Sequence, residues 1–443
     1  MENMIDLSII ILAAGKGSRM KSVLPKVMHP LAGRPMIGWL LECAEALEPA
    51  QIIVVAGPDM KELEEVCVSH TVAIQQQQNG TADAVKAALP LLKNETGNVL
   101  ILLGDEPFVS IETLLGMINA PVPTIMAFRA EDPSGFGRLI QRADHTLQEI
   151  VEDKDANEQQ RLITLCNAGN FCLPLKRLQD WLPKITNENA QGEYYLTDLP
   201  KIAAQDHVFF EIVEVEADHG WGINDRMQLA AHEAFVQNAL RGAALEAGVT
   251  LIDPYTTYFS WDTEIGRDVT IEPNVFFGPG VKVGDGTTIK MSTRIEGAHI
   301  GKNCEIGPFA HINYPKKPSI IGDDVVIGNF VEVKRSVLKD GVKAKHHAYI
   351  ADAEIGKKSN IACGAITVNY DGYQKHKTII GENVMVGSNV SLIAPITVGD
   401  GAFIAAGSTI SDNIPDNALA IERTKPELRE GWASAYRNRK KKV

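Results

Sequence analysis

Residues 265–295 read IGRDVTIEPNVFFGPGVKVGDGTTIKMSTRI, and a large apolar residue recurs at every sixth position of this stretch. The recurring positions are Ile265, Ile271, Phe277, Val283, Ile289 and Ile295. A period of six is typical of a parallel β-helix, in which equivalent side chains stack from coil to coil. The alternative is a β-sandwich in which this spacing arises by chance. Six successive positions in register argue against that alternative.

The same period resets after short insertions and continues nearly to the C-terminus. Its later positions are Ile300, Ile306, Ile312, Ile321, Ile327, Val333, Ile355, Ile361, Ile380, Val386, Leu392, Val398, Ile404 and Ile410. We therefore expect residues 250–443 to form a hexapeptide β-helix domain with a basic C-terminal tail.

The first half of the chain has a different pattern, because short apolar runs alternate with segments of helical spacing. Predicted strands are Ile9–Ala14, Gln51–Ala56 and Asn98–Leu103, and predicted helices are Met36–Leu47 and Thr81–Leu92. Such alternation favours an α/β domain with a Rossmann-like, mostly parallel sheet over residues 1–224, with ligands at the carboxyl ends of its strands. A long helix over Asp225–Ala247 predicts a helical linker over 225–249.

Composition narrows the functional classes. The 443 residues are 45% hydrophobic and 22% charged, with a net charge of −13, which excludes whole-chain disorder and argues against a nucleic-acid or anionic-membrane binder. The N-terminus lacks the pattern of a signal peptide, and no run is long enough to span a membrane. The six cysteines (Cys43, Cys67, Cys166, Cys172, Cys304 and Cys363) match no zinc spacing. We expect a soluble cytoplasmic protein with reduced cysteines.

A glycine-rich loop follows the first predicted strand. The string LAAGKGSRM spans residues 12–20, and Lys26 follows shortly after it. Small residues allow backbone N–H groups to approach an anion, while Arg19 and Lys26 supply the positive charge that a triphosphate needs. The string is neither a Walker loop nor a dinucleotide fingerprint.

This string resembles the sugar-nucleotide pyrophosphorylases. Together with the hexapeptide half, it is similar to the family of bifunctional N-acetylglucosamine-1-phosphate uridyltransferases/glucosamine-1-phosphate acetyltransferases, from Ile9 to about Trp432. Further matching strings are GTA (80–82), LGD (103–105), GFGR (135–138), IVEDKDA (150–156), NAQGEYYLTD (189–198) and GINDR (222–226). The resemblance implies a left-handed β-helix, a homotrimer, and acetyl transfer from acetyl-CoA to glucosamine-1-phosphate. Uridylyl transfer from UTP to N-acetylglucosamine-1-phosphate would then give UDP-N-acetylglucosamine, a cell-envelope precursor, and pyrophosphate.

The resemblance also implies the residues of the uridyltransferase site. Arg19 and Lys26 would be catalytic, through charge on the phosphates. The substrate-binding set would be Leu12, Ala13, Ala14, Gly15, Lys26, Gln75, Gly80, Thr81, Leu103, Gly104, Asp105, Gly137, Glu152, Asn167 and Asn224. Gln75 begins a run of four glutamines, of which we expect the other three to face solvent.

Asp105 and Asn224 would bind Mg²⁺, which usually keeps several waters and takes further ligands from substrate phosphates. Read without the resemblance, Asp105 is equally well a turn residue after a buried strand. Asn224 is then most simply the N-cap of the long helix.

For the acetyltransferase site, the resemblance implies His346 as the base that takes the amine proton, with Glu332 orienting it. Glucosamine-1-phosphate would contact Lys334, Tyr349 and Asn360. Acetyl-CoA would contact Cys363, Asn369, Tyr370, Ser388, Ala406 and Arg423.

This half departs from the family pattern near these residues. Asn313 stands where the family has an arginine, and an amide cannot supply the bidentate charged contact of a guanidinium. Ala351 and Cys363 also depart from it, at positions where the family has glycine and alanine. One alternative is therefore a uridyltransferase whose β-helix serves only for trimerisation. Another is a regulatory protein that binds sugar nucleotides without turnover, which the intact Arg19, Lys26, Asp105 and Asn224 oppose.

Overall fold

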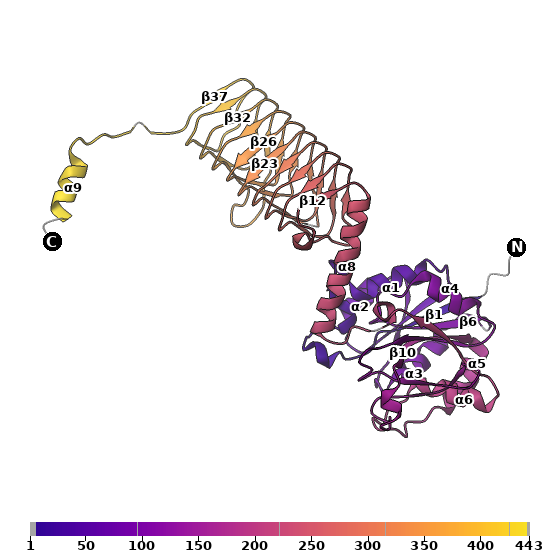
Figure 1. Ribbon diagram of the computed structural model, residues 1–443. Helices are drawn as coiled ribbons and strands as arrows, with labels where there is room; N and C mark the ends of the chain where they lie inside the picture. Colours follow the sequence, from indigo (N-terminus) through magenta and orange to yellow (C-terminus); the bar gives the residue numbers. More distant parts are fainter. Residues whose placement is uncertain (1–5, 95, 221, 315, 425, 441–443) are drawn as a thin grey trace. The chain divides into compact units, whose positions relative to one another are not determined.

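The computed structural model describes residues 6–94, 96–220, 222–314, 316–424 and 426–440. Its contacts divide the chain within helix α8 (Arg226–Glu246) into two compact units, residues 1–236 and 237–443. Both units are drawn in Figure 1.

The first unit is built on a sheet with the strand order β11-β7-β10-β6-β1-β4-β5. The strands are β1 (Leu7–Leu12), β4 (Gln51–Ala56), β5 (Thr71–Ile74), β6 (Asn98–Leu103), β7 (Thr124–Arg129), β10 (Leu165–Pro174) and β11 (Glu211–Val215). All neighbours are parallel except β10, which is antiparallel to β6 and β7. The short strands β8 (Arg138–Gln141) and β9 (Leu147–Val151) pair with each other, and β8 joins β10. The predicted mostly parallel sheet is confirmed.

Helices cover both faces of this sheet, which explains why its central strands lack an apolar–polar alternation. On one face, Ile10 and Leu12 of β1 share a core with helices α3 (Thr81–Ala88), α5 (Leu175–Trp181) and α6 (Leu199–Gln205). On the other face, Ile9 and Ile11 share a core with α1 (Met36–Glu45), α2 (Lys61–Val66) and α4 (Ile111–Asn119).

Some predicted boundaries need correction. The first strand begins at Leu7 and ends at Leu12, because the backbone after Leu12 turns into the glycine-rich loop. The helix predicted over Thr81–Leu92 is α-helical only to Ala88 and continues as a 3₁₀ turn over Leu89–Leu91. Pro90 explains the change, since it lacks the N–H that an α-helical hydrogen bond needs.

The second unit is a parallel β-helix with three sheets, as the period of six predicts (Figure 1). The first sheet contains β12 (Thr250–Leu251), β14 (Thr270–Ile271), β17 (Thr288–Ile289), β20 (Glu305–Ile306), β23 (Val326–Asn329), β26 (Lys343–His346), β29 (Asn360–Ile361), β32 (Met385–Val386), β35 (Phe403–Ile404) and β37 (Leu419–Ala420). The second contains β13 (Glu264–Ile265), β16 (Val281–Val283), β19 (Ala298–Ile300), β22 (Ser319–Ile321), β25 (Val337–Leu338), β28 (Ala353–Ile355), β31 (Thr378–Ile380) and β34 (Ile396–Val398). The third contains β15 (Phe276–Phe277), β18 (Arg294–Ile295), β21 (His311–Asn313), β24 (Glu332–Lys334), β27 (Tyr349–Ala351), β30 (Ile366–Val368), β33 (Ser391–Ile393) and β36 (Thr409–Ile410).

Strand pairing confirms the hexapeptide register. Ile265 pairs with Val283, eighteen positions along the chain, so that three six-residue steps complete one coil. Val283 then pairs with Ile300, and the aliphatic side chains of all coils form one continuous core. Ile355 pairs with Ile380, and the longer step between them holds a loop over residues 369–377.

The end of α8 within the second unit covers the first coil. Leu240 and Ala244 pack against the β-helix core. Gln237 exchanges two hydrogen bonds with the backbone of Phe259, at 2.7 and 2.9 Å. At the other end of the unit, helix α9 (Trp432–Lys440) carries the basic tail, and its side chains are exposed.

Candidate active sites

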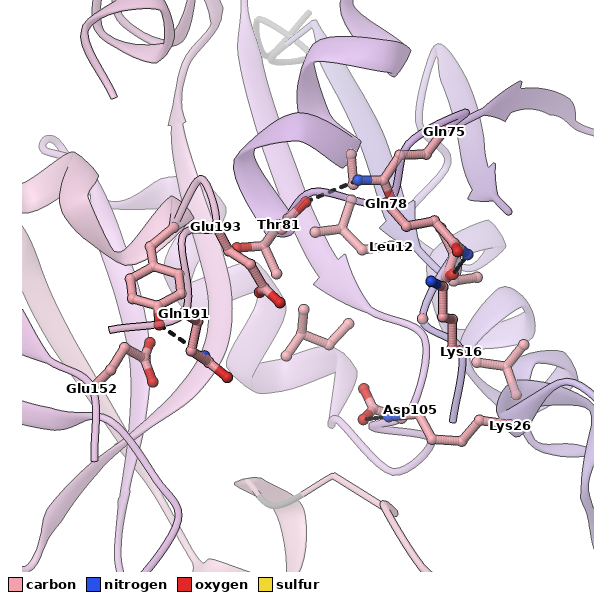
Figure 2. Close-up of a pocket in the computed structure, with 18 residues that line it drawn as sticks. Leu12, Lys16, Lys26, Gln75, Gln78, Thr81, Asp105, Glu152, Gln191 and Glu193 are labelled. Carbon is pink, nitrogen blue, oxygen red and sulfur yellow. Dashed lines mark hydrogen bonds and ion pairs between the residues drawn. The ribbon is translucent and has the colours of Figure 1, made fainter. Parts of the chain in front are cut away.

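A cavity of about 510 Å³ lies in the first unit, where β1 and β6 end and α3 begins. Figure 2 shows Lys26 and Asp105 at one end of it and Glu152 and Gln191 at the other. Its lining comprises Leu12, Ala13, Ala14, Gly15, Lys16, Lys26, Val27, Gln75, Gln78, Gly80, Thr81, Ala84, Leu103, Asp105, Glu152, Gln191, Glu193 and Tyr195. The position agrees with the expectation that ligands bind at the carboxyl ends of parallel strands.

Most of the predicted uridyltransferase residues meet in this cavity. The predicted positions that lie outside the lining are Arg19, Gly104, Gly137, Asn167 and Asn224. Asn224 contacts the lining residue Lys26, Gly104 lies between Leu103 and Asp105, and Gly137 lies beside Glu152, while Arg19 and Asn167 contact Asn224 and Gly137 in turn. Gly104 also donates its backbone N–H to the Leu12 carbonyl at 2.9 Å, and an added Cβ would lie 3.0 Å from the same oxygen.

Four polar side chains converge at the end of the cavity where Lys26 and Asp105 lie. The Lys26 ammonium contacts the Asp105 carboxylate and lies 3.1 Å from the side-chain oxygen of Asn224. Arg19 Nη2 donates to the same Asn224 oxygen at 2.8 Å. Residues from three distant segments therefore form one polar cluster, as the prediction requires.

The start of α8 explains how Asn224 is free to join this cluster. The Asp225 carboxylate accepts the backbone N–H groups of Met227 and Gln228 at 2.9 Å, so that Asp225 performs the capping. The simpler interpretation of Asn224 as the cap is therefore wrong. Arg226 strengthens the junction, since its Nε donates to the Met20 carbonyl at 3.1 Å, at the end of the glycine-rich loop.

Asp105 and Asn224 also meet the chemical requirements for Mg²⁺. Their side-chain oxygens both face the Lys26 ammonium, and such oxygens are the ligands that Mg²⁺ prefers. Among the described residues there is no cluster of three or more His, Cys, Asp or Glu side chains suited to a metal ion. The residues present thus fit an ion that takes few ligands from protein and the rest from phosphates and water.

The opposite end of the cavity is suited to a sugar. Glu152 accepts a hydrogen bond from the Thr197 hydroxyl at 2.9 Å. Burial, reinforced by nearby aspartates, raises the pKa of Glu152 despite this hydrogen bond. An added Cβ on Gly137 would lie 3.5 Å from both Glu152 Oε1 and Asn167 Cβ, so the three predicted sugar-binding residues are neighbours.

The glutamine run needs a correction. Gln75 is buried, and its amide donates to the Gly80 carbonyl at 3.0 Å and to the Asp83 carboxylate at 2.8 Å. Gln78 does not face solvent as expected, because its amide contacts the Ala14 carbonyl and it lines the cavity. Only Gln76 and Gln77 of the run are exposed.

The sequence prediction missed several lining residues, namely Lys16, Val27, Gln78, Ala84, Gln191, Glu193 and Tyr195. Gln191 Nε2 donates to the Tyr195 hydroxyl at 2.7 Å across this wall. Gln191, Glu193 and Tyr195 belong to the string NAQGEYYLTD, and its match to the family was the signal that could have found them.

In the second unit, several predicted acetyltransferase residues form a column along one corner of the β-helix. His346, Cys363, Ser388 and Ala406 lie at the same corner in successive coils. Backbone N–H groups of Gly364, Asn389 and Gly407 join these coils, donating to the carbonyls of His347, Cys363 and Ser388 at 2.7–2.8 Å. Arg423 Nη1 donates to the Ala406 carbonyl at 2.9 Å and extends the column.

The hydrogen-bond partner of His346 differs from the expectation. Asn329 lies directly beside His346 in the sheet register, and its side-chain oxygen is 3.0 Å from His346 Nδ1. Glu332 instead pairs in register with Tyr349 and accepts from the Lys334 ammonium at 2.8 Å. His346 is thus hydrogen-bonded to Asn329, and Glu332 to Lys334.

The remaining predicted residues surround the same coils. Lys334 ends β24 and Tyr349 begins β27, on the third sheet. Asn360 lies on the first sheet, and its amide contacts the sulfur of Met385 at 3.3 Å. Asn369 and Tyr370 start the 369–377 loop, directly after a strand of the third sheet. His346 lies at the other end of the strands of this sheet, just before β27.

Comparisons with known proteins identify the family of both halves of the chain. A family model described as a MobA-like NTP transferase domain matches residues 9–166, and a bacterial transferase hexapeptide model matches 262–297 and 377–412. Proteins named "Bifunctional protein GlmU" from Zymomonas mobilis, Sphingopyxis alaskensis and Paramagnetospirillum magneticum are 44%, 45% and 44% identical to this chain. These alignments cover 98%, 99% and 97% of the chain and 98%, 98% and 96% of the relatives. The chain belongs to the GlmU family.

Membership of the GlmU family confirms the resemblance identified from the sequence, and with it the expectation of a bifunctional enzyme. Among the helices of the described residues, none combines the length and apolar character that a membrane crossing needs. The six cysteines are free, and Cys363 is the exposed one.

Asn313, where the sequence resemblance predicts an arginine, has polar neighbours on its own strand and on the next coil. The Asn313 amide nitrogen lies 2.9 Å from His311 Nε2, on the same short strand β21. Asn313 pairs in register with Lys334, so a cationic side chain still lies directly beside the position of the missing arginine.

Proposed function

We propose that this chain makes UDP-N-acetylglucosamine in two steps, acetylation of glucosamine-1-phosphate followed by uridylyl transfer. The observation that carries the proposal is the convergence of the glycine-rich loop, Lys26, Asp105 and Glu152 in one cavity of a GlmU-family chain. Phosphate chemistry at one end and a sugar-binding carboxylate at the other match the two substrates of uridylyl transfer.

In the uridyltransferase site, a phosphate oxygen of N-acetylglucosamine-1-phosphate attacks the α-phosphorus of UTP, and the bond between the α-phosphorus and its bridging oxygen breaks to release pyrophosphate. Lys26 and Arg19 neutralise charge that develops on the phosphates, while small residues of the loop allow backbone N–H groups to approach. Glu152 accepts hydrogen bonds from the sugar and orients it for in-line attack. Asp105 and Asn224 would hold Mg²⁺, which would supply further charge neutralisation.

In the acetyltransferase site, the amine of glucosamine-1-phosphate attacks the thioester carbonyl of acetyl-CoA, and the carbon–sulfur bond breaks to release the thiol. His346 takes the proton that the amine loses, and Asn329 fixes the orientation of its ring. Lys334 contacts the phosphate of glucosamine-1-phosphate, and Tyr349 and Asn360 also bind this substrate. Acetyl-CoA is bound by Cys363, Asn369, Tyr370, Ser388, Ala406 and Arg423.

Thiol release from acetyl-CoA tests the acetyltransferase activity. Release that depends on glucosamine-1-phosphate supports both activities. A chain that forms UDP-N-acetylglucosamine from UTP and N-acetylglucosamine-1-phosphate, but releases no thiol, contradicts the acetyltransferase and leaves the β-helix as a trimerisation scaffold.

We further propose that residues 1–224, 225–249 and 250–443 are the uridyltransferase domain, linker and acetyltransferase domain of a cytoplasmic homotrimer. A stacked pair of exposed aromatic rings, Phe309 and Phe330 at 5.3 Å, supports association through the β-helix, because exposed aromatic pairs are typical of interfaces. Sedimentation of the wild type and of Phe330→Asp tests this: a wild-type monomer contradicts the trimer.

A further inference from the structure

A ladder of four side chains runs up one corner of the β-helix. Tyr314, Arg335, Asp352 and Asn369 each follow directly after a strand of the third sheet, in four successive coils. The guanidinium carbon of Arg335 lies 4.6 Å from the Tyr314 ring centroid. The same guanidinium donates from Nε and Nη2 to the two oxygens of Asp352, both at 2.7 Å.

The pair of Arg335 and Asp352 is well shielded. The two side chains are 9% and 18% exposed, whereas both side chains of the pairs Lys282–Glu264 and Lys302–Asp285 are 52–65% exposed. A bidentate pair in such a position is stronger and more precisely oriented than a surface pair. Both residues also have left-handed backbone conformations, at φ 48° and 49°, which direct their side chains along the corner.

The upper end of the ladder holds the 369–377 loop. The amide nitrogen of Asn369 donates to the Asp352 carboxylate, which thereby binds Arg335 and Asn369 together. The loop is otherwise folded on itself: His376 N–H donates to the Asn369 carbonyl at 2.8 Å, and the Asp371 carboxylate accepts from the backbone of Tyr373 and Gln374. The orientation of Asn369 therefore fixes the start of a compact loop relative to the coils.

We propose that Arg335 and Asp352 are positioning residues for acyl-donor binding. Their ion pair holds Asn369, and through it the adjacent Tyr370, in the orientation that acetyl-CoA requires. Neither residue touches the reacting atoms. The inference rests on the proposed acetyltransferase function. It assigns the support of the 369–377 loop to Asp352, one coil below Asn369, and to Arg335, two coils below.

Arg335→Ala tests the proposal in the full-length chain. Without the guanidinium, the Asp352 carboxylate loses its bidentate partner. Asp352 then holds Asn369 less rigidly. We expect the KM for acetyl-CoA to rise about tenfold, as for loss of a charge-assisted hydrogen bond. The KM for glucosamine-1-phosphate and the uridyltransferase rate should stay within about twofold of wild type.

The conservative variant separates positioning from general stability. Arg335→Lys keeps the charge but not the two parallel hydrogen bonds, and should give an intermediate KM for acetyl-CoA. Lys302→Ala is the matched control, because it breaks a single exposed ion pair with Asp285 (2.9 Å) on an earlier coil. This control should leave both KM values unchanged, and thermal unfolding of each variant reports whether the β-helix is intact.

The outcomes are distinct. Two results overturn the proposal. One is an unchanged KM for acetyl-CoA in Arg335→Ala. The other is that the KM values for acetyl-CoA and for glucosamine-1-phosphate rise by the same factor in Arg335→Ala and in Arg335→Lys. Wild-type protein that releases no thiol overturns the acetyltransferase function itself, and the positioning role falls with it.

Discussion

The ammonium nitrogen of Lys26 lies 3.1 Å from the side-chain oxygen of Asn224, although 197 residues separate them in the chain. Lys26 also contacts Asp105, so that one cation holds together the two predicted Mg²⁺ ligands. The carboxylate of Asp105, which follows β6, and the amide oxygen of Asn224, which precedes α8, thus form an oxygen-rich position around this cation. The cluster predicts a strong dependence of uridylyl transfer on each of its members.

Asp105→Asn is expected to lower Mg²⁺-dependent pyrophosphate release by about a hundredfold or more, because the amide cannot supply the negative charge that a divalent cation requires. Pyrophosphate release from UTP and N-acetylglucosamine-1-phosphate, measured over a series of Mg²⁺ concentrations, checks this. Thiol release from acetyl-CoA by the same preparation is the control and should be largely unchanged. Comparable loss of both activities would contradict two independent sites.

His346→Ala is expected to do the reverse, with acetylation falling by about a hundredfold or more and uridylyl transfer retained. Asn329→Ala should cause a smaller loss of about five- to tenfold, since it removes one hydrogen bond that orients the ring. Rates of thiol release at saturating substrates separate the two. An unchanged rate in His346→Ala would remove the proposed base.

The difference between Asn329 and Glu332 shows where sequence reasoning reaches its limit. The period of six predicts the core positions because each of them points into the same aliphatic stack. The neighbours of a polar residue depend instead on the length of each coil. Asn329 and His346 are seventeen positions apart, one fewer than the ideal eighteen, and this shorter step sets the pairing.

In the cavity of the first unit, too, some residues could be predicted from the sequence and others could not. The loop over residues 12–20, Lys26 and Asp105 were predictable because small residues, cations and a carboxylate follow buried strands. Gln191 and Tyr195 were not, because their contribution depends on how a distant loop folds back over α3. Asn224 required the structure as well, since only the hydrogen bonds of Asp225 show which residue caps the helix.

Glu152→Gln should weaken sugar binding and change the pH dependence of stability. Burial raises the pKa of Glu152, so the folded state binds the proton more tightly than the unfolded state does. The stability of wild type relative to Glu152→Gln should therefore fall as pH rises above the ordinary glutamate pKa of about 4.3, and level off above the raised pKa. Thermal unfolding of both proteins at acidic and neutral pH measures this difference.

The same variant should raise the KM for N-acetylglucosamine-1-phosphate about tenfold, because a neutral amide replaces a charged acceptor. Glu158→Gln is a suitable control, since Glu158 is exposed on the same loop. A relative stability of wild type and Glu152→Gln that does not vary with pH would contradict a buried, perturbed carboxyl group.

Gly80→Ala should damage both the fold and the cavity. Gly80 has φ 111° and precedes α3, and an added Cβ would lie 2.5 Å from the Tyr194 carbonyl oxygen and 2.9 Å from its nitrogen. Tyr194 holds this position through backbone hydrogen bonds with Asn79 and Ala82, at 2.8 and 3.0 Å. The methyl group would displace the segment that carries Gln191, Glu193 and Tyr195 into the cavity wall. We expect the free energy of unfolding to fall by about 3 kcal/mol, together with a higher KM for UTP.

Gly135→Ala separates the steric clash from the backbone strain. Gly135 also has a left-handed conformation, at φ 85°, but an added Cβ there meets no atom within 4 Å. Strain alone should cost about 1 kcal/mol, as is usual for a non-glycine residue at positive φ. Denaturant unfolding of the two variants gives the comparison. Equal losses in the free energy of unfolding would mean that the close approach of Tyr194 to Gly80 does not constrain the site. The segment around Tyr194 would then move aside at little cost, despite its backbone hydrogen bonds.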